Sequence, residues 1–358
     1  MTEPDRDLIM QALERVVDPE LRKPVTELDM VRAVEIDGGD VRVTIALTVA
    51  GCPLRDSFQD QVAEVLRDVP HVERVALGFD VMTADERQAL TTKLRGGVHE
   101  RSQGLSLDAS TRVLAVCSGK GGVGKSTLTA NLAVALAQRG KQVGVLDADV
   151  YGHSIPHVLG IHQKPVLVDK MIVPPVKHDL KLMSIGFFLE DNQPVMWRGP
   201  MLHRALEQFL SDVHWGELDV LVVDMPPGTG DVAISLGQLL PRAETIVVTT
   251  PQPAAQEVAS RAGVMAQKTG MRLVGVVENM SGEVFGSGGG QRLADELGVP
   301  LLGRVPLDPV LRECGDAGEP LLVAGPHSDS GRALDRIAEA VLSLDRGSIV
   351  KPLTLVSS

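Results

Sequence analysis

A glycine-rich stretch near the middle of the chain has the residue types of a phosphate-binding loop. It contains four glycines, two lysines and two hydroxyl residues, in the order Gly119, Lys120, Gly121, Gly122, Val123, Gly124, Lys125, Ser126 and Thr127. An apolar run over 113–117 precedes it and a helical pattern over 128–138 follows it. The glycines let consecutive backbone N–H groups turn toward phosphates, and the helix N-terminus adds partial positive charge. We therefore predict that Lys125 bridges the β and γ phosphates of a nucleotide and that the Ser126 hydroxyl ligates Mg2+, in preference to an ordinary turn before a helix.

Three aspartates follow apolar runs that predict strands. Asp147 and Asp149 come after the run 142–146, and Asp224 ends the run 220–223 in the form of a Walker B strand. We expect Asp224 to contribute to the magnesium shell and the 147–149 pair to reach the metal or the attacking water. For Asp147 the alternative is a cap on the next turn. Two prolines and two glycines in 225–231 suit a segment that senses the γ-phosphate, with a rigid turn as the alternative.

The larger part of the chain alternates short apolar runs with helical patterns. The runs cover 113–117, 142–146, 220–223, 245–250, 273–277 and 301–305. Because they do not alternate between polar and apolar residues, they predict strands covered on both faces, and the intervening helices predict a parallel sheet. We predict a doubly wound, mostly parallel α/β domain over residues 111–350, followed by a tail over 351–358.

The first part of the chain has the pattern of a separate small α/β domain over residues 1–95. Helical spacing covers 5–17 and 58–68, and strand-like runs cover 41–47 and 72–77. Residues 96–110 have no sustained period and are rich in glycine, serine and charge, which predicts a linker.

Composition limits the classes of partner. The 358 residues carry a formal net charge of -12, which disfavours binding to nucleic acid or to acidic lipid headgroups. The polar start lacks the features of a signal peptide, and no run approaches the ~20 apolar residues of a membrane span. The three widely spaced cysteines do not form a disulfide framework. We expect a cytoplasmic protein that binds neither membrane nor nucleic acid.

Several segments resemble the Mrp/ApbC family of iron-sulfur cluster carriers, which is related to the MinD, ParA and nitrogenase iron-protein ATPases. The matching segments are Lys120, 147–152, 196–201, 224–231, 249–252 and 278–281, of which 196–201, 249–252 and 278–281 separate Mrp from its relatives. Segments 18–21 and 47–54 resemble the companion module that precedes many Mrp ATPases. The resemblance implies a P-loop NTPase fold behind a small α/β domain.

The resemblance also implies roles for individual residues. Lys120 would reach the nucleotide of a second protomer, so that a homodimer encloses ATP, and Lys120, Lys125 and Asp149 would be the catalytic residues. Asp149 would orient the attacking water, Asp147 and Asp224 would hold the magnesium region, and Asn279 would read the adenine edge. Apoprotein clients and iron-sulfur assembly proteins would be the partners.

The chain departs from the family pattern at the cluster site. The family has a Cys-x-x-Cys pair shortly after the segment that matches 279–281, but residues 282–290 contain no cysteine. Cys117 lies in a predicted core strand and Cys314 at a predicted helix end without a partner. Cys52 lies on a turn ahead of a helix, whose N-terminus would favour the thiolate, and it matches the reactive cysteine of the companion module. Cys52 is therefore the candidate iron-sulfur ligand.

Three functional hypotheses follow from these features. The first is an ATPase that uses Mg2+ and ATP and binds and transfers iron-sulfur clusters to apoproteins. The second is an ATP-gated scaffold that lacks a cluster because the cysteine pair is absent. The third is a positioning switch like MinD or ParA. The overall acidity disfavours DNA binding, and the proline in residues 349–358 disfavours a membrane-binding helix, so both count against this hypothesis.

Overall fold

The computed structural model of the protein describes residues 3–49, 54–94, 107–108, 110–150, 152–189 and 199–344. The chain divides into two compact units. Unit 1 comprises residues 1–111, 161–183 and 187–219, and unit 2 comprises residues 112–160, 184–186 and 220–358. The boundaries near residues 95 and 110 remain a prediction.

A large sheet has the order β10-β11-β7-β12-β6-β13-β14-β15. Six of its strands are β6 (Arg112–Ser118), β7 (Val143–Asp147), β12 (Val220–Asp224), β13 (Glu244–Thr249), β14 (Arg272–Ser281) and β15 (Leu301–Pro306). They pair in parallel, whereas β10 (Val176–Lys177) and β11 (Leu180–Ser184) pair antiparallel. Every residue of β7, β12 and β13 is buried, which explains why their sequences show no alternation. The prediction of a mostly parallel sheet is confirmed.

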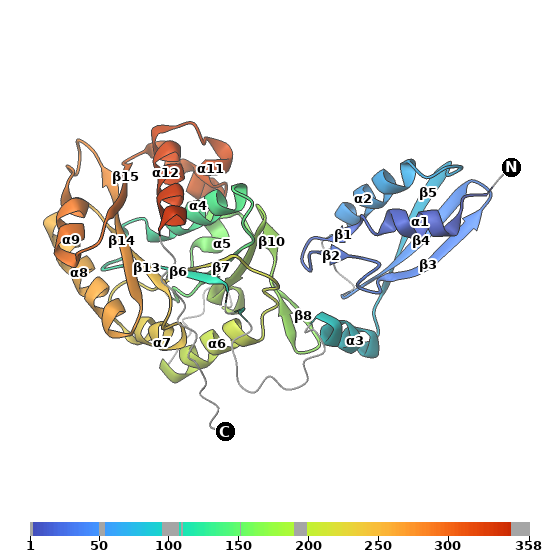
Figure 1. Ribbon diagram of the computed structural model, residues 1–358, viewed down its shortest axis with the longest axis horizontal. Coiled ribbons are helices and arrows are strands. Elements are labelled where there is room, and N and C mark those ends of the chain that lie inside the picture. The colour runs from blue at the N-terminus through green and yellow to red at the C-terminus, as the bar shows by residue number, and fades with distance from the viewer. Residues whose placement is uncertain are drawn as a thin grey trace, which may run out of the picture. The chain divides into compact units, whose positions relative to one another are not determined.

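Helices cover both faces of this sheet (Figure 1). In unit 2 they are α4 (Lys125–Gln138), α5 (Ile155–Val158), α7 (Asp231–Leu239), α8 (Pro253–Lys268), α9 (Gly289–Leu297), α10 (Pro309–Ala317), α11 (Leu321–Ala324) and α12 (Asp329–Ser343), and the 3-10 helix η1 (Ile185–Phe188) follows β11. α4 packs against α12, while α8 packs against α7 and α9. The arrangement is doubly wound, as predicted.

Unit 1 contains a three-stranded sheet of β3 (Val31–Asp37), β4 (Asp40–Leu47) and β5 (Arg74–Val81), in which β3 is antiparallel and β5 parallel to β4. Its helices are α1 (Arg6–Leu13), α2 (Arg55–Arg67), α3 (Ala84–Leu94) and α6 (Gly199–Ser211). It also contains two short strand pairs, β1 (Val17–Asp18) with β2 (Lys23–Pro24) and β8 (Val166–Val168) with β9 (Met171–Val173). Buried residues of β8 and β9 belong to the same core as those of α1, α2 and β4.

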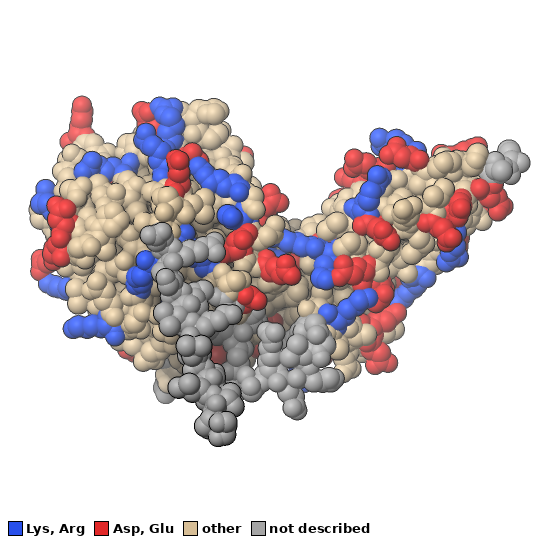
Figure 2. Space-filling view, in the orientation of Figure 1, with Lys and Arg blue, Asp and Glu red and all other residues tan. Residues whose placement is uncertain are grey.

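The surface of the protein carries charges of both signs. On the face shown in Figure 2, basic and acidic side chains are interspersed over both units. Within the described part of the chain, no helix has both the length and the apolar character that crossing a bilayer requires.

Candidate functional site

The glycine-rich loop joins the end of β6 to the start of α4. Gly122 and Gly124 have φ angles of +77° and +81°, in the left-handed region that favours glycine. A Cβ atom added at Gly121 or Gly122 would meet no other atom within 4 Å. The loop backbone is therefore accessible along this stretch, as close approach by a phosphate group requires.

Both ends of the loop are fixed by close packing. A Cβ atom at Gly119 would lie 2.2 Å from the backbone carbon of Val258, so only glycine lets β6 and α8 approach this closely. A Cβ atom at Gly124 would lie 2.1 Å from Asn279 Nδ2, and that nitrogen donates to the Val123 carbonyl oxygen at 2.8 Å. Asn279, at the end of β14, is thus part of the packing that holds the loop.

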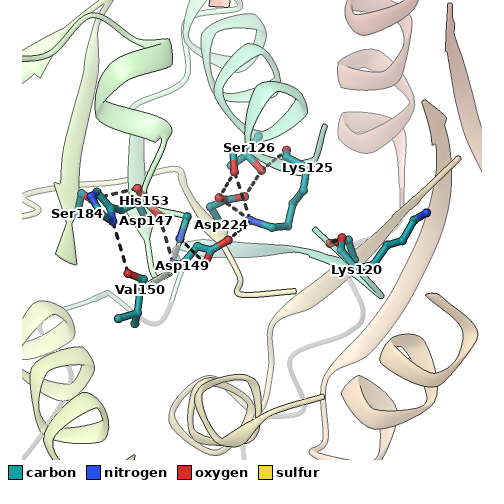
Figure 3. Close-up of polar contacts among 12 residues, drawn as sticks. Lys120, Lys125, Ser126, Asp147, Asp149, Val150, His153, Ser184 and Asp224 are labelled. Atoms are coloured by element: carbon teal, nitrogen blue, oxygen red, sulfur yellow. Dashed lines mark hydrogen bonds and ion pairs between the residues drawn. The ribbon is translucent and has the colours of Figure 1, made fainter. Parts of the chain in front are cut away.

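Lys125 lies among acidic side chains at the carboxyl ends of the strands (Figure 3). Its Nζ is 2.6 Å from Asp224 Oδ2 and 3.4 Å from Asp149 Oδ2. The Ser126 hydroxyl donates to Asp224 Oδ2 at 2.6 Å, and the Thr129 hydroxyl donates to Oδ1 at 2.7 Å. Because β12 runs parallel to β6, its last residue reaches the first turns of α4, which hold both carboxylate oxygens of Asp224.

Asp147 ends β7 and is fully buried beside Asp224. Its Oδ2 accepts from the Ser184 hydroxyl at 3.0 Å and its Oδ1 from the Asp149 amide at 3.2 Å. Burial raises the pKa of Asp147 well above its usual range, and the neighbouring Asp224 raises it further. Hydrogen bonding from Ser184 and the charge of Lys125 act in the opposite direction.

The structure gathers most of the predicted site residues and leaves others apart. Lys125, Ser126, Asp147, Asp149 and Asp224 form one cluster (Figure 3). In the same view the exposed Lys120 side chain points away from that cluster. The half-buried Thr127 also lies apart from it, and its carbonyl oxygen accepts a hydrogen bond from the Asn131 side chain at 2.9 Å. Cys52 lies outside the described residues.

Two hydroxyl groups that hold the carboxylates were missed by the sequence reasoning. Thr129 lies four residues after Lys125, so the helical period places both side chains on one face of α4, and this spacing could have indicated it. Ser184 lies in β11, and nothing in its local sequence connects it with Asp147.

The donor set suits a hard divalent cation. Three aspartates, Asp147, Asp149 and Asp224, face a single lysine, and the Ser126 hydroxyl adds a neutral oxygen. Mg2+ prefers oxygen ligands and usually takes one or two carboxylates together with phosphates and water. Among the described residues, no group of three or more His, Cys, Asp or Glu is arranged to hold a metal ion.

The described cysteines do not suit thiolate chemistry. Burial raises the pKa of Cys117 to about 12. Burial also raises the pKa of Cys314, as do the nearby carboxylates of Glu319, Asp308 and Glu313. Both thiols therefore stay protonated at neutral pH, whereas thiolates are the usual cluster ligands.

Comparison with known sequences identifies the family. The model of the NUBPL iron-transfer P-loop NTPases matches residues 109–342, and that of an iron-sulfur cluster assembly protein matches residues 6–77. An iron-sulfur cluster carrier protein of Mycobacterium leprae is 52% identical over 358 residues, covering 95% of this chain and 94% of its own. The iron-sulfur cluster carrier protein of a Synechocystis strain is 42% identical over 351 residues, covering 94% and 96%.

Solved structures agree with this assignment. A nucleotide-binding protein of Archaeoglobus fulgidus in complex with ADP superposes with a TM-score of 0.53 at 36% identity, covering 61% of this chain and 89% of its own. The cell division ATPase MinD of Pyrococcus furiosus superposes with a TM-score of 0.52 at 24% identity over 64% and 98%, which shows a common fold. The chain belongs to the NUBPL-type iron-transfer P-loop NTPases, the family of the iron-sulfur cluster carrier proteins.

Proposed function

We propose that the protein hydrolyses ATP with Mg2+ and, as a cytoplasmic homodimer, carries iron-sulfur clusters from assembly proteins to apoproteins. The observation that carries the ATPase part is the position of Lys125, 2.6 Å from Asp224 and 3.4 Å from Asp149 at the end of the glycine loop. The carrier part rests on the names of relatives that align with nearly the whole chain.

Lys125 and Asp224 would exchange partners when ATP binds. In the structure, the lysine ammonium and the Ser126 hydroxyl both contact Asp224 Oδ2. Phosphate oxygens at the loop would draw Lys125 toward the β and γ phosphates, which leaves Asp224 and Ser126 for the cation. Bound Mg2+ would offset the phosphate charge. Asp147 would supply a second carboxylate to the magnesium region.

Asp149 is the candidate for orienting the attacking water. Its Oδ1 accepts from the Gly152 amide at 3.1 Å, so its carboxylate is held by the backbone that follows β7. Its Oδ2 lies 3.4 Å from Lys125 Nζ, so the carboxylate is placed beside the lysine that would hold the phosphates.

The test of the ATPase assignment is Lys125→Ala. We expect hydrolysis to fall by about 10²–10³-fold, because the transferred phosphoryl group loses the charge that follows it into the transition state. Lys120→Ala should leave nucleotide binding within about threefold of the unmutated protein yet slow hydrolysis, because its exposed side chain is expected to act across the dimer. Retention of near-normal turnover in Lys125→Ala would contradict the assignment.

The cluster assignment is tested by anaerobic reconstitution with iron and sulfide, followed by iron counting and visible absorption. With Cys117 and Cys314 protonated, we expect substoichiometric binding that depends on Cys52 and survives Cys117→Ser and Cys314→Ser. A cluster retained by Cys52→Ser through gel filtration would place the ligands elsewhere.

An ATP-gated scaffold without a cluster is the second candidate function. It is favoured by the hairpin that occupies residues 282–286, where Gly282 and Gly286 exchange backbone hydrogen bonds at 2.9 and 2.7 Å and no thiol is present. Absence of any cluster in the unmutated protein, even with added thiols and ATP, would favour this candidate.

A further inference from the structure

Asp147 depends on a side chain that lies outside every motif of the nucleotide site. We propose that Ser184 is a positioning residue for the divalent cation, because its hydroxyl fixes the Asp147 carboxylate in the orientation that the cation needs. The inference rests on the proposed role of Asp147 in the magnesium region.

The direction of the Ser184 hydrogen bond follows from its second partner. Ser184 is fully buried, and its Oγ lies 3.1 Å from the Gly186 amide and 3.0 Å from Asp147 Oδ2. A backbone N–H can only donate, so Oγ accepts from Gly186. The single hydroxyl proton is therefore directed at Asp147.

Two donors on opposite oxygens fix the rotation of the Asp147 carboxylate. Ser184 binds Oδ2, and the Asp149 amide binds Oδ1. The backbone is held as well, since Asp147 pairs with Asp224 across the parallel ladder and the Ala148 amide donates to the Asp224 carbonyl oxygen at 3.0 Å. Each oxygen retains lone-pair capacity for a cation or its water.

Loss of the Ser184 hydroxyl would release this carboxylate. Asp147 would keep only the Asp149 amide as a donor to its side chain, so the carboxyl group would be free to rotate out of the orientation seen in the structure. A carboxylate that must be reoriented before it can bind gives a weaker cation site, as is common when partners behind metal ligands are removed.

The segment that carries Ser184 is itself held against the loop after β7. A Cβ atom at Gly186 would lie 2.5 Å from His153 Cδ2, and His153 Nδ1 lies 3.4 Å from the Val150 carbonyl oxygen. Ser184 and His153 lie together to one side of the Lys125–Asp224 cluster (Figure 3). The two segments thus meet at two points, which keeps the hydroxyl in register with Asp147.

The test compares Ser184→Ala, Ser184→Thr and the control Ser330→Ala. Ser330 on α12 is equally buried, and its hydroxyl has no hydrogen-bond partner among the described residues, so its loss removes the same atom without touching the site. Mn2+ binding in the presence of a non-hydrolysable ATP analogue is measured by electron paramagnetic resonance, and nucleotide binding is measured separately in EDTA.

We expect Ser184→Ala to weaken Mn2+ binding by about tenfold and to raise the Mg2+ concentration for half-maximal hydrolysis similarly. Nucleotide binding in EDTA should stay within about threefold, Ser184→Thr should restore most of the Mn2+ affinity, and Ser330→Ala should match the unmutated protein. If Ser184→Ala fails to fold, Ser184→Cys, which retains a weaker donor, must bind Mn2+ less tightly than Ser184→Thr.

Asp147→Ala, measured in parallel, distinguishes the metal role of Asp147 from the positioning role of Ser184. Unchanged Mn2+ affinity in Asp147→Ala would remove the proposed metal role of that residue. Weaker binding in Asp147→Ala together with unchanged binding in Ser184→Ala would overturn the positioning role alone. An equal loss of Mn2+ affinity and of nucleotide affinity in EDTA would also overturn it, because that pattern indicates general damage to the fold.

Discussion

The contact between Gly124 and Asn279 gives a quantitative test of the loop geometry. In Gly124→Ala, an alanine at φ +81° costs about 1–2 kcal/mol of stability from the left-handed conformation alone. The new Cβ would also lie 2.1 Å from Asn279 Nδ2, so the amide must leave the Val123 carbonyl oxygen. Loss of that hydrogen bond adds about 0.5–1.5 kcal/mol, for a total of about 1.5–3.5 kcal/mol.

Gly122→Ala is the matched control. Its φ of +77° carries the same backbone cost, but its Cβ would meet nothing within 4 Å. The difference between the two variants therefore isolates the Asn279 contact. Adding Asn279→Ala removes the side chain that the new Cβ strikes, so the extra cost of Gly124→Ala should disappear in that background.

Calorimetric unfolding without nucleotide measures these differences, since 1 kcal/mol corresponds to about 2–4 °C in the Tm of a domain of about 150–250 residues. Equal Tm shifts for Gly122→Ala and Gly124→Ala, or an extra loss of stability that persists with Asn279→Ala, would refute the proposed contact.

The Asn279→Ala protein also tests the choice of base. If Asn279 reads the adenine edge, Asn279→Ala should narrow the preference for ATP over GTP. Equal affinities for ATP and GTP in the unmutated protein would remove that role.

Mixing Lys120→Ala with Asp149→Ala protein should restore hydrolysis beyond either parent, because each mixed dimer then contains one complete site; no recovery would count against the role of Lys120 across the dimer. Gly121→Ala should leave the Tm within about 2 °C of the unmutated protein, because its Cβ meets nothing within 4 Å. It should nevertheless weaken ATP binding, because the added Cβ would lie where the phosphates contact the loop backbone. An unchanged affinity for ATP would show that the phosphates do not contact the loop at Gly121. Burial, with the Asp18 carboxylate, raises the pKa of Glu20 from 4.5 to about 7, so ionised Glu20 lowers stability as pH rises through that window. Glu20→Gln should therefore stabilise the protein by up to about 3 kcal/mol above about pH 8 and by much less below about pH 5, and a Tm difference that is independent of pH would contradict this.

Much of unit 2 could be predicted because its strands are buried on both faces. The apolar runs at 113–117, 142–146 and 220–223 correspond to β6, β7 and β12, and the glycine loop fixes the start of α4. Local sequence is informative there since burial demands the same residue types along the whole strand.

Elements set by distant contacts were harder to predict. The helix predicted over 5–17 ends at Leu13, because the Val16 carbonyl oxygen accepts a hydrogen bond from the Val25 amide and Val17 pairs with Pro24 in β1 and β2. The short strands β8 to β11 were not predicted, since two to five residues give too little periodicity to recognise.

The site divides in the same way. Lys125 lies in a phosphate-binding loop and Asp224 ends a Walker B strand. Both motifs predict contact with a nucleotide and its cation, so the proximity of the two side chains could be expected from the sequence. Ser184 lies 37 residues from Asp147, and only the sheet brings the two side chains together. A buried serine has no local signal that separates a positioning role from packing.

The segment after Asn279 explains why the proposed cluster site must differ from the family pattern. The buried Glu278 carboxylate accepts from the Ser281 hydroxyl at 2.7 Å and from the Gly288 and Gly290 amides at 3.2 and 2.5 Å, which ties both ends of the segment together.

Between these ties, Gly282 and Gly286 close a short hairpin whose tip exposes 73% of Val284. The hairpin contains no thiol, and the described cysteines elsewhere have raised pKa values. In the proposed function, a cluster must therefore use Cys52 or thiols from a client or small molecule. In the sequence, Cys52 lies in the small domain predicted over residues 1–95, and the glycine loop lies in the ATPase domain predicted over residues 111–350. We therefore expect ATP hydrolysis and cluster binding to be separable, because their candidate ligands lie in different predicted domains.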